Sequence, residues 1–392
     1  MKLSLARANR FHFDPLLLCV SVSLLLIGFV MVSSASLHLG VKMTGDSLYY
    51  PVRQLMHIGL GLILGGCVAA TPMRVWEENG PKLFIAGLML LIIVLIPGLG
   101  VKVNGSVRWL SIAGLRIQVS EVVKFFSVIY MAGYVTRHQS TVQDSAFGLL
   151  KPLALFSIAC LLLLLEPDFG SAVVILMIAM GVMFLAGARL SQFIVLLLII
   201  GILAMLLVYF SPYRLVRVTS FMDPWADPLK TGFQLVQALI SFGRGEWLGV
   251  GLGSGIQKLF YLPEAHTDFL FSVIAEELGL LGVVTVIGLF SLLVWRTFEI
   301  AEAAEQAGQR FSAFIAYGLG IWFGFQSFVN MGVNMGILPT KGLTLPLMSY
   351  GGGSMMIMCC AIALLFRVQS ETAETNASTV PAQRMGARGY HG

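Results

Sequence analysis

Three titratable side chains, Glu264, His266 and Asp268, lie within five residues of one another at the start of a long apolar run. Carboxyl and imidazole groups at an apolar boundary are suited to acid–base chemistry or to metal binding. Burial would raise the pKa of Asp268 whereas a helix N-terminus would lower it, so the net direction stays open. Thr267 or Asp268 could instead cap the following helix, and for Asp268 in isolation the residue type favours the cap.

Other charged residues lie at or inside apolar runs, where ionisable groups are costly and therefore suggest function. Glu121 and Lys124 are three residues apart and can neutralise each other on one helical face, as a structural ion pair or as part of a site. The neighbouring Glu276 and Glu277 need partners, protonation or water, and basic residues elsewhere in the bundle could pair with them. Arg108 is followed by Trp109, a pair that fits a membrane-interface anchor or a ligand site equally well.

A segment rich in glycine and proline, residues 334–354, precedes the last apolar run and carries Lys341 and Ser349. Irregular backbone at membrane depth is tolerated only where protein or a watery cavity satisfies its polar groups. A lysine among glycines suggests phosphate binding, but the Walker spacing is absent, so this hypothesis is weak when taken alone.

The elements that must position these residues are membrane-spanning helices. The chain is 57% hydrophobic and only 11% charged, too few charges to cover a soluble protein of 392 residues. Its apolar runs are mostly about 17 to 20 residues long, enough to cross a hydrocarbon core of about 30 Å. We therefore predict an all-α integral membrane protein of about ten transmembrane helices, at residues 15–34, 54–71, 81–98, 118–136, 149–165, 169–187, 192–210, 267–295, 312–335 and 346–367.

The predicted organisation is a cytoplasmic segment at 1–14, a membrane domain at 15–367 and a disordered cytoplasmic tail at 368–392. Basic residues near most helix ends on one side place both termini in the cytoplasm and the long 211–266 loop, between helices seven and eight, on the outer side. Part of this loop, Thr231–Phe242, is amphipathic and could lie in the membrane interface or pack on the bundle. Basic residues occur singly, which argues against nucleic-acid binding.

Five ordered motifs resemble the SEDS family of peptidoglycan glycosyltransferases, and the resemblance covers about residues 12–367. The motifs are NGSVRWL at 104–110, SEVVKF at 120–125, EPDFGSA at 166–172, LPEAHTDFLFSVIAEELG at 262–279, and Pro339–Gly353. Pro339–Gly342 is similar to the division-associated branch of the family, because the elongation-associated branch usually lacks Lys341. Gly353 departs from the family pattern, which usually has serine at that position.

The resemblance implies a ten-helix enzyme that polymerises lipid II into glycan strands during septal cell-wall synthesis, with the long loop shaping a periplasmic site. It also implies that Asp268 is the essential carboxylate, which reverses the preference for a cap. Asp268 would then be the general base on the acceptor sugar, and cations would stabilise the departing undecaprenyl pyrophosphate. The candidate substrate-binding residues are Arg108, Lys124, Glu264, His266, Lys341 and Ser349.

We expect no organic cofactor, while a divalent cation, Mg²⁺ or Mn²⁺, could bind at Asp268 or Glu264. The partners implied are lipid II, the nascent glycan strand, a class B penicillin-binding transpeptidase similar to FtsI, and divisome proteins similar to FtsQ, FtsL, FtsB and FtsN. The implied location is the bacterial cytoplasmic (inner) membrane at the division septum. Two alternatives stay open: a lipid II flippase or transporter, suggested by buried charges, and a non-catalytic division scaffold.

Overall fold

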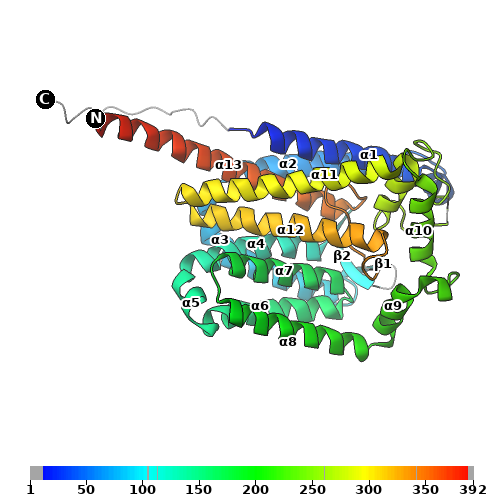
Figure 1. The fold of residues 1–392 in the computed structure, drawn as a ribbon, viewed down its shortest axis with the longest axis horizontal. Coiled ribbons are helices and arrows are strands. Elements are labelled where there is room, and N and C mark those ends of the chain that lie inside the picture. Colours follow the sequence, from blue (N-terminus) through cyan, green and yellow to red (C-terminus); the bar gives the residue numbers. More distant parts are fainter. Residues whose placement is uncertain (1–11, 104–105, 113, 260, 341, 387–392) are drawn as a thin grey trace.

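The protein is a bundle of long helices in the computed structural model, which describes residues 12–103, 106–112, 114–259, 261–340 and 342–386 (Figure 1). Long apolar helices make up most of this part of the chain. They are α1 (Pro15–Thr44), α2 (Tyr49–Ala70), α3 (Met73–Leu95), α4 (Val119–Arg137), α6 (Ala146–Leu165), α7 (Phe169–Leu185), α8 (Leu190–Tyr209), α11 (Leu270–Gln306), α12 (Arg310–Asn334) and α13 (Gly352–Gly386).

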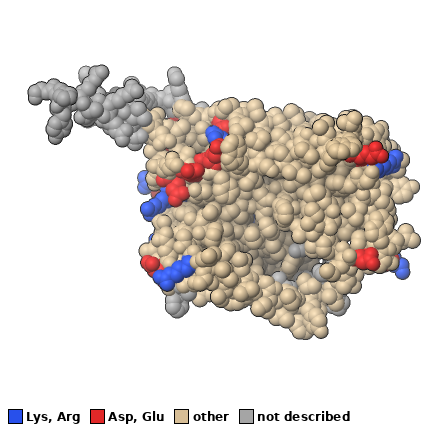
Figure 2. All heavy atoms as spheres, viewed as in Figure 1, with Lys and Arg blue, Asp and Glu red and all other residues tan. Residues whose placement is uncertain are grey.

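The distribution of charge fits a membrane-crossing bundle. Eight of these helices are long and apolar enough to span a membrane, and α7 and α8 contain shorter apolar stretches. On the face drawn in Figure 2, lysine, arginine, aspartate and glutamate gather toward the two ends of the bundle. A broad band with few charged residues lies between them. Such a band is what a hydrocarbon core requires, because charged groups are costly there. The prediction of about ten apolar helices in a membrane protein is therefore confirmed.

A small antiparallel sheet, which the all-α prediction did not include, connects α3 to α4. It consists of β1 (Gly100–Val103), β2 (Ser106–Ile112) and β3 (Leu115–Gln118), in that order. Residues Val101, Val107 and Ile117 are β-branched, which favours the extended backbone of strands over a helix. The sheet ends at Gln118, the residue that precedes the first turn of α4, so it fixes where α4 begins.

The long connection between α8 and α11 contains α9 (Pro212–Met222), the 3-10 turn η1 (Pro224–Ala226) and α10 (Phe233–Gly245). In Figure 1 these elements and the sheet lie at one end of the bundle, which we call the Asp268 end. Leu235, Val236 and Ala238 of α10 are buried, and α10 packs against α11 and α12. Of the two alternatives for this amphipathic segment, the helix packed on the bundle is the one observed.

Helices α4 and α12 form much of the interior. Helix α12 packs against α11, α4 and α7, and its side chains Trp322 and Phe323 are fully buried. Val123 and Val128 of α4 are also fully buried. A buried polar side chain on either helix must therefore find its partner within the protein, because neither water nor lipid headgroups reach it.

The disordered tail predicted from residue 368 is wrong for the part that the structure describes, because α13 continues as a helix to Gly386. Glu371 accepts the backbone N–H of Met73 at the start of α3, at 3.0 Å. Gln309, between α11 and α12, donates to the Thr375 hydroxyl at 2.6 Å. Polar groups at helix ends thus replace water as partners of this polar stretch.

Several predicted boundaries also need correction. Helix α1 extends ten residues past the predicted end at 34, α11 begins at Leu270 rather than at 267, and α13 begins at Gly352 rather than at 346. In the predicted N-terminal segment, residues 1–11 lie outside the described residues. Asp14 accepts the Leu17 N–H at 2.9 Å and so caps α1, and its other oxygen pairs with Arg296.

Candidate active site

Asp268 lies just before α11 and does not cap it. The helix begins at Leu270, the capping position is Phe269, and no side chain of that residue bonds to the helix. The Asp268 backbone carbonyl accepts two side-chain N–H groups of α12, from Asn330 at 3.0 Å and from Asn334 at 2.9 Å. The cap interpretation of Thr267 or Asp268 is therefore wrong, and the backbone of Asp268 is fixed by a neighbouring helix instead.

Asn334 takes the role that a capping side chain would have. Its side-chain oxygen accepts the backbone N–H of Ser272 at 3.1 Å and the Ser272 hydroxyl at 2.7 Å. These bonds satisfy a donor in the first turn of α11, where helical N–H groups have no partner within the helix. Because Asn334 is fully buried, it ties the start of α11 to the end of α12 without competition from water.

The irregular segment before α13 passes directly over Asp268. A Cβ atom at Gly342 would lie 3.0 Å from Oδ2 of Asp268, so a side chain there would crowd the carboxylate. The next two residues are held by α12, since Leu343 O accepts from Asn330 and Thr344 O accepts from Gln326 at 2.9 Å. Protein donors thus satisfy this non-helical backbone, as membrane depth requires. Lys341, the neighbouring predicted site residue, lies outside the described residues.

Three amides of α12, Gln326, Asn330 and Asn334, recur every fourth residue and form what we call the amide stripe. Side chains four residues apart lie on one face of a helix, so the stripe faces a single side. It holds residues 343 and 344 of the irregular segment together with the Asp268 backbone. These residues were not predicted as part of the site, although three amides at this spacing in an apolar span were a usable signal.

Glu121 and Lys124 form a buried ion pair. The lysine Nζ lies 2.7 Å from Glu121 Oε1 and 2.9 Å from Gln326 Oε1, and the exposed fractions of the two residues are 2% and 0%. The Trp322 indole N–H donates to the same Gln326 oxygen at 2.8 Å. These contacts favour the structural ion pair of the two sequence interpretations and link the pair to the amide stripe.

Arg108 of β2 binds the turn between α6 and α7. Its guanidinium donates to the carbonyl oxygens of Glu166 at 3.1 Å and of Pro167 at 2.5 Å. This turn continues into α7 through Asp168, which accepts the Ser171 N–H at 3.2 Å, and through Gly170, which packs against Leu343. The strand therefore holds a cation against the turn before α7, and α7 in turn contacts the irregular segment at Leu343.

Glu166 itself is buried, with an exposed fraction of 1%, and within the described residues neither carboxyl oxygen has a hydrogen-bond partner. Burial, aided by the nearby Asp168 charge and opposed by Arg108, raises the pKa of Glu166 from 4.5 to about 8. A carboxyl with this pKa is mostly protonated at neutral pH, which avoids an uncompensated buried charge.

This shift predicts a pH dependence of stability. The folded state holds the Glu166 proton more tightly than the unfolded chain does, so the free energy of unfolding should fall between about pH 4.5 and pH 8, by at most about 1.4 kcal/mol per pH unit, and then level off. Glu166→Gln should flatten this decline and raise the melting temperature at pH 8. The measurement is thermal unfolding of the purified protein from pH 5 to 9.

The matched control is Glu302→Gln, which changes an exposed glutamate on α11. This variant should keep the pH slope of the wild-type protein. If Glu166→Gln also keeps that slope, the Glu166 carboxyl is already ionised at neutral pH. The predicted rise in its pKa would then be wrong.

Glu264 and His266 contact different neighbours. Glu264 Oε2 accepts the Thr267 hydroxyl at 2.8 Å, whereas the His266 ring packs against Tyr50 and Tyr350 with ring centroids 5.1 Å and 5.4 Å away. Burial lowers the pKa of His266 and Glu264 opposes this effect, so a neutral imidazole is favoured. The three titratable residues thus share a turn, but the His266 ring packs among aromatic side chains.

Ser349 closes a turn rather than lining an open surface. Its hydroxyl accepts the Leu345 N–H at 2.9 Å, and the residue is buried with an exposed fraction of 3%.

As for metals, the described residues contain no group of three or more His, Cys, Asp and Glu side chains that could hold an ion. The carboxylates Asp268 and Glu264 therefore do not form a complete protein ligand set within the described part of the chain.

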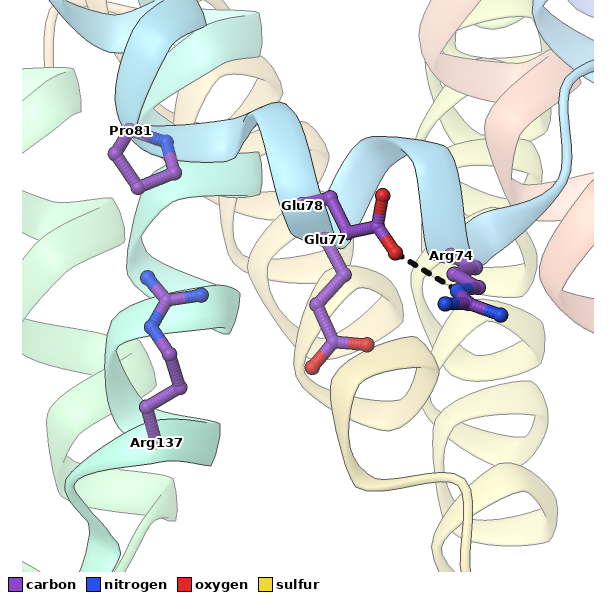
Figure 3. Close-up of a pocket in the computed structure, with 5 residues that line it drawn as sticks. All are labelled: Arg74, Glu77, Glu78, Pro81 and Arg137. Carbon is purple, nitrogen blue, oxygen red and sulfur yellow. Dashed lines mark hydrogen bonds and ion pairs between the residues drawn. The ribbon is translucent and has the colours of Figure 1, made fainter.

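A separate charged hollow lies between side chains of α3 and α4 (Figure 3). It has a volume of about 660 Å³ and is lined by Arg74, Glu77, Glu78, Pro81 and Arg137. Arg74 and Glu78 form an exposed ion pair across one turn of α3, a type of contact that contributes little to stability. Since α4 starts at the Asp268 end and finishes at Arg137, this hollow is a bundle length away from the candidate site.

The site is thus a carboxylate whose backbone is fixed by two amides, with an arginine-bound turn packed on the segment that covers it. A fixed carboxylate at the end of a membrane bundle can accept a proton from a hydroxyl of a lipid-linked substrate. The cation Arg108 can stabilise negative charge that develops on a leaving group.

Comparison with known proteins identifies relatives of the whole chain. The chain is 65% identical to the "Probable peptidoglycan glycosyltransferase FtsW" of Methylomonas methanica, over 95% of this chain and 96% of that protein. It is 61% identical to the protein of the same name from Methylococcus capsulatus, over 93% and 92% of the two chains.

Solved structures show the same fold. A chain from the study "Structural coordination of polymerization and crosslinking by a peptidoglycan synthase complex" has a TM-score of 0.74 and 30% identity, covering 92% of this chain and 98% of that one. The rod shape determining protein RodA of Thermus thermophilus has a TM-score of 0.68 and 27% identity, covering 92% and 98% of the two chains. Residues 15–374 match the family model described as "Cell cycle protein", so the chain belongs to the FtsW/RodA/SpoVE family.

Proposed function

We propose that this protein is a peptidoglycan glycosyltransferase that polymerises lipid II into glycan strands during septal cell-wall synthesis. The observation that carries the proposal is the fixed Asp268 at the end of a membrane bundle, beneath the irregular segment at Gly342. The names of the curated relatives, at 61–65% identity over almost the whole chain, support the same activity.

In the proposed reaction, Asp268 removes the proton from the 4-hydroxyl of the acceptor's N-acetylglucosamine. The oxygen attacks the anomeric carbon of the growing strand, a C–O bond forms, and the bond from that carbon to the diphosphate oxygen breaks. The electron pair of the broken bond leaves with undecaprenyl pyrophosphate, so one inverting step needs no enzyme nucleophile. Arg108 is the proposed cation that stabilises the departing charge, and binding of a divalent cation at Asp268 or Glu264 stays a prediction.

The proposed orientation places the Asp268 end in the periplasm and both chain termini in the cytoplasm, in the bacterial inner membrane at the division septum. The long connection with α9 and α10 lies at the Asp268 end, where a lipid-linked sugar would meet it (Figure 1). Basic residues near most helix ends on the opposite side support this orientation. A related chain was solved as part of a peptidoglycan synthase complex, which supports a class B penicillin-binding transpeptidase as partner.

Polymerisation is tested with purified protein, lipid II in detergent, and separation of glycan strands by length. We expect strands to form with the protein alone or after addition of a class B transpeptidase whose own active site is blocked. Transport of labelled lipid II across liposomes without polymer would instead support a flippase, and neither activity would support a scaffold.

Lys124 gives a further prediction, because it is both a candidate cation and half of a buried pair. Lys124→Ala should destabilise the protein by roughly 3–5 kcal/mol, since it leaves the Glu121 charge buried and uncompensated. The double variant Glu121→Gln/Lys124→Met should recover much of this loss, measured as the melting temperature. If the double variant also polymerises lipid II normally, Lys124 has only the structural role, whereas a stable but inactive double variant assigns it to the substrate.

A further inference from the structure

Helix α11 is broken near its start, and a loop fills the break. Gly279 has φ 65° and ψ −160°, which no residue in a continuous helix adopts and which glycine tolerates best. The break separates the first turns of α11, residues 270–278, from the long remainder that ends at Gln306. Asp268 lies directly before the shorter part.

The hydrogen bonds lost at the break are replaced one for one by residues 246–251. In a continuous helix the N–H groups of Leu280 and Leu281 would bind the carbonyls of Glu276 and Glu277. Here Leu280 N donates to Glu246 O at 2.9 Å and Leu281 N donates to Trp247 O at 3.2 Å. The freed carbonyls accept from two loop residues, from Val250 at 3.0 Å and from Gly251 at 3.1 Å.

The side chains of Glu276 and Glu277 hold the same loop, and both are fully buried. Glu276 accepts the backbone N–H groups of Ile256 at 2.9 Å and Gln257 at 3.2 Å, and Arg244 lies 3.4 Å from it. Each carboxylate thus stabilises the backbone of the loop through charge-assisted hydrogen bonds. The expectation that basic residues elsewhere pair with these glutamates is confirmed for Glu276.

Glu277 completes the arrangement by pairing with a lysine. Lys258 Nζ lies 2.5 Å from Glu277 Oε1 and 2.7 Å from the Ser34 hydroxyl of α1. Ser34 also donates to Glu277 at 2.8 Å, and the N–H of Gly253 donates to the same carboxylate at 3.0 Å. Lys258 is 7% exposed, so this ion pair is shielded from water. Removal of either member would leave the other as an uncompensated buried charge.

We infer that Glu276, Glu277 and Lys258 are positioning residues, which hold residues 245–258 and the first turns of α11 as one unit that carries Asp268. The unit is attached to α12 by Asn334 at its start and to α1 by Ser34 at its end. Because Gly279 interrupts the helix, the remainder of α11 does not fix this unit by itself. Together with Asn330 and Asn334, the loop contacts therefore determine where Asp268 lies relative to the substrate.

The experiment compares the full-length purified protein with Lys258→Met and Lys258→Arg, using hydrogen exchange and lipid II polymerisation. In Lys258→Met we expect amide exchange to rise about tenfold both in 246–258 and in 270–278. The kcat should fall about tenfold or more while KM changes little, because Asp268 is misplaced and substrate binding is not. Lys258→Arg keeps the cation and should restore most of kcat.

The control is Arg296→Met, which removes a basic residue from α11 beyond the break, where it pairs with Asp14 and Glu299. It should leave exchange in 270–278 and kcat unchanged. Faster exchange confined to 246–258, unchanged kcat in Lys258→Met, or equal effects in the control would each overturn the inference. The measurement of kcat rests on the proposed function, whereas hydrogen exchange needs no substrate. If the wild-type protein has no polymerase activity, the proposed function is refuted. The coupling between residues 246–258 and 270–278 is then still tested by exchange.

Discussion

Replacing Asp268 with asparagine is expected to lower the rate of lipid II polymerisation by about 10²–10⁴-fold, the usual contribution of a general base. Asparagine has nearly the same shape, but its amide does not accept a proton at neutral pH. The backbone carbonyl of residue 268 can still bind Asn330 and Asn334, so the protein should stay folded. The measurement is the initial rate of glycan strand formation, with the melting temperature as a check on folding.

The control for this variant is Asp223→Asn, which makes the same chemical change in the same long connection, at the exposed end of α9. It should polymerise lipid II at the wild-type rate. Full activity of Asp268→Asn would remove Asp268 as the base and would leave the site without its proton acceptor.

Asn334→Leu is expected to reduce both stability and kcat. Asn334 is fully buried and bonds to Ser272 and to the Asp268 carbonyl, so leucine would leave several buried polar groups without partners. Each such group costs roughly 1–3 kcal/mol, which should lower the melting temperature by several degrees. The kcat should fall as well, because the start of α11 loses its attachment to α12. Thermal unfolding and polymerisation kinetics measure the two effects.

A matched change is Asn79→Leu on α3, where the asparagine side chain donates only to the Val75 carbonyl one turn away. This variant should be nearly as stable and as active as the wild-type protein. If Asn334→Leu behaves in the same way, the contacts of Asn334 do not hold Asp268 in place.

The membrane helices could be predicted from the sequence because one quantity, the length of an uninterrupted apolar run, determines whether a segment can span the membrane. Apolar runs long enough to cross the hydrocarbon core mark α4 and α12 to within two residues. The small sheet was missed because strands of four and seven residues leave no comparable signal between two apolar runs. The helical end of α13 was missed because polar residues without periodicity form a helix only when groups elsewhere bind them.

The residues of the site also fall into those that the sequence identifies and those that only the structure reveals. Asp268 was identifiable because a carboxylate at the start of an apolar run requires an explanation, and the resemblance to a family supplied one. The spacing of the amide stripe was a usable signal, but its partner was not identifiable, since the stripe acts on a backbone carbonyl 62 to 66 residues away in the chain. The loop that fills the α11 break is equally hidden, because Glu277 and Lys258 are 19 residues apart in the chain and meet only in the folded protein, beside the break at Gly279.

The docked end of α13 also determines where this protein can be joined to a fluorescent reporter. A fusion made at residue 368 would discard Glu371 and Thr375, and with them the acceptors for the Met73 N–H and for Gln309. The start of α3 and the turn between α11 and α12 would then lose their polar partners at the same time. A reporter joined beyond residue 377 keeps these contacts, so such a fusion should report the location of a protein whose helix ends are intact.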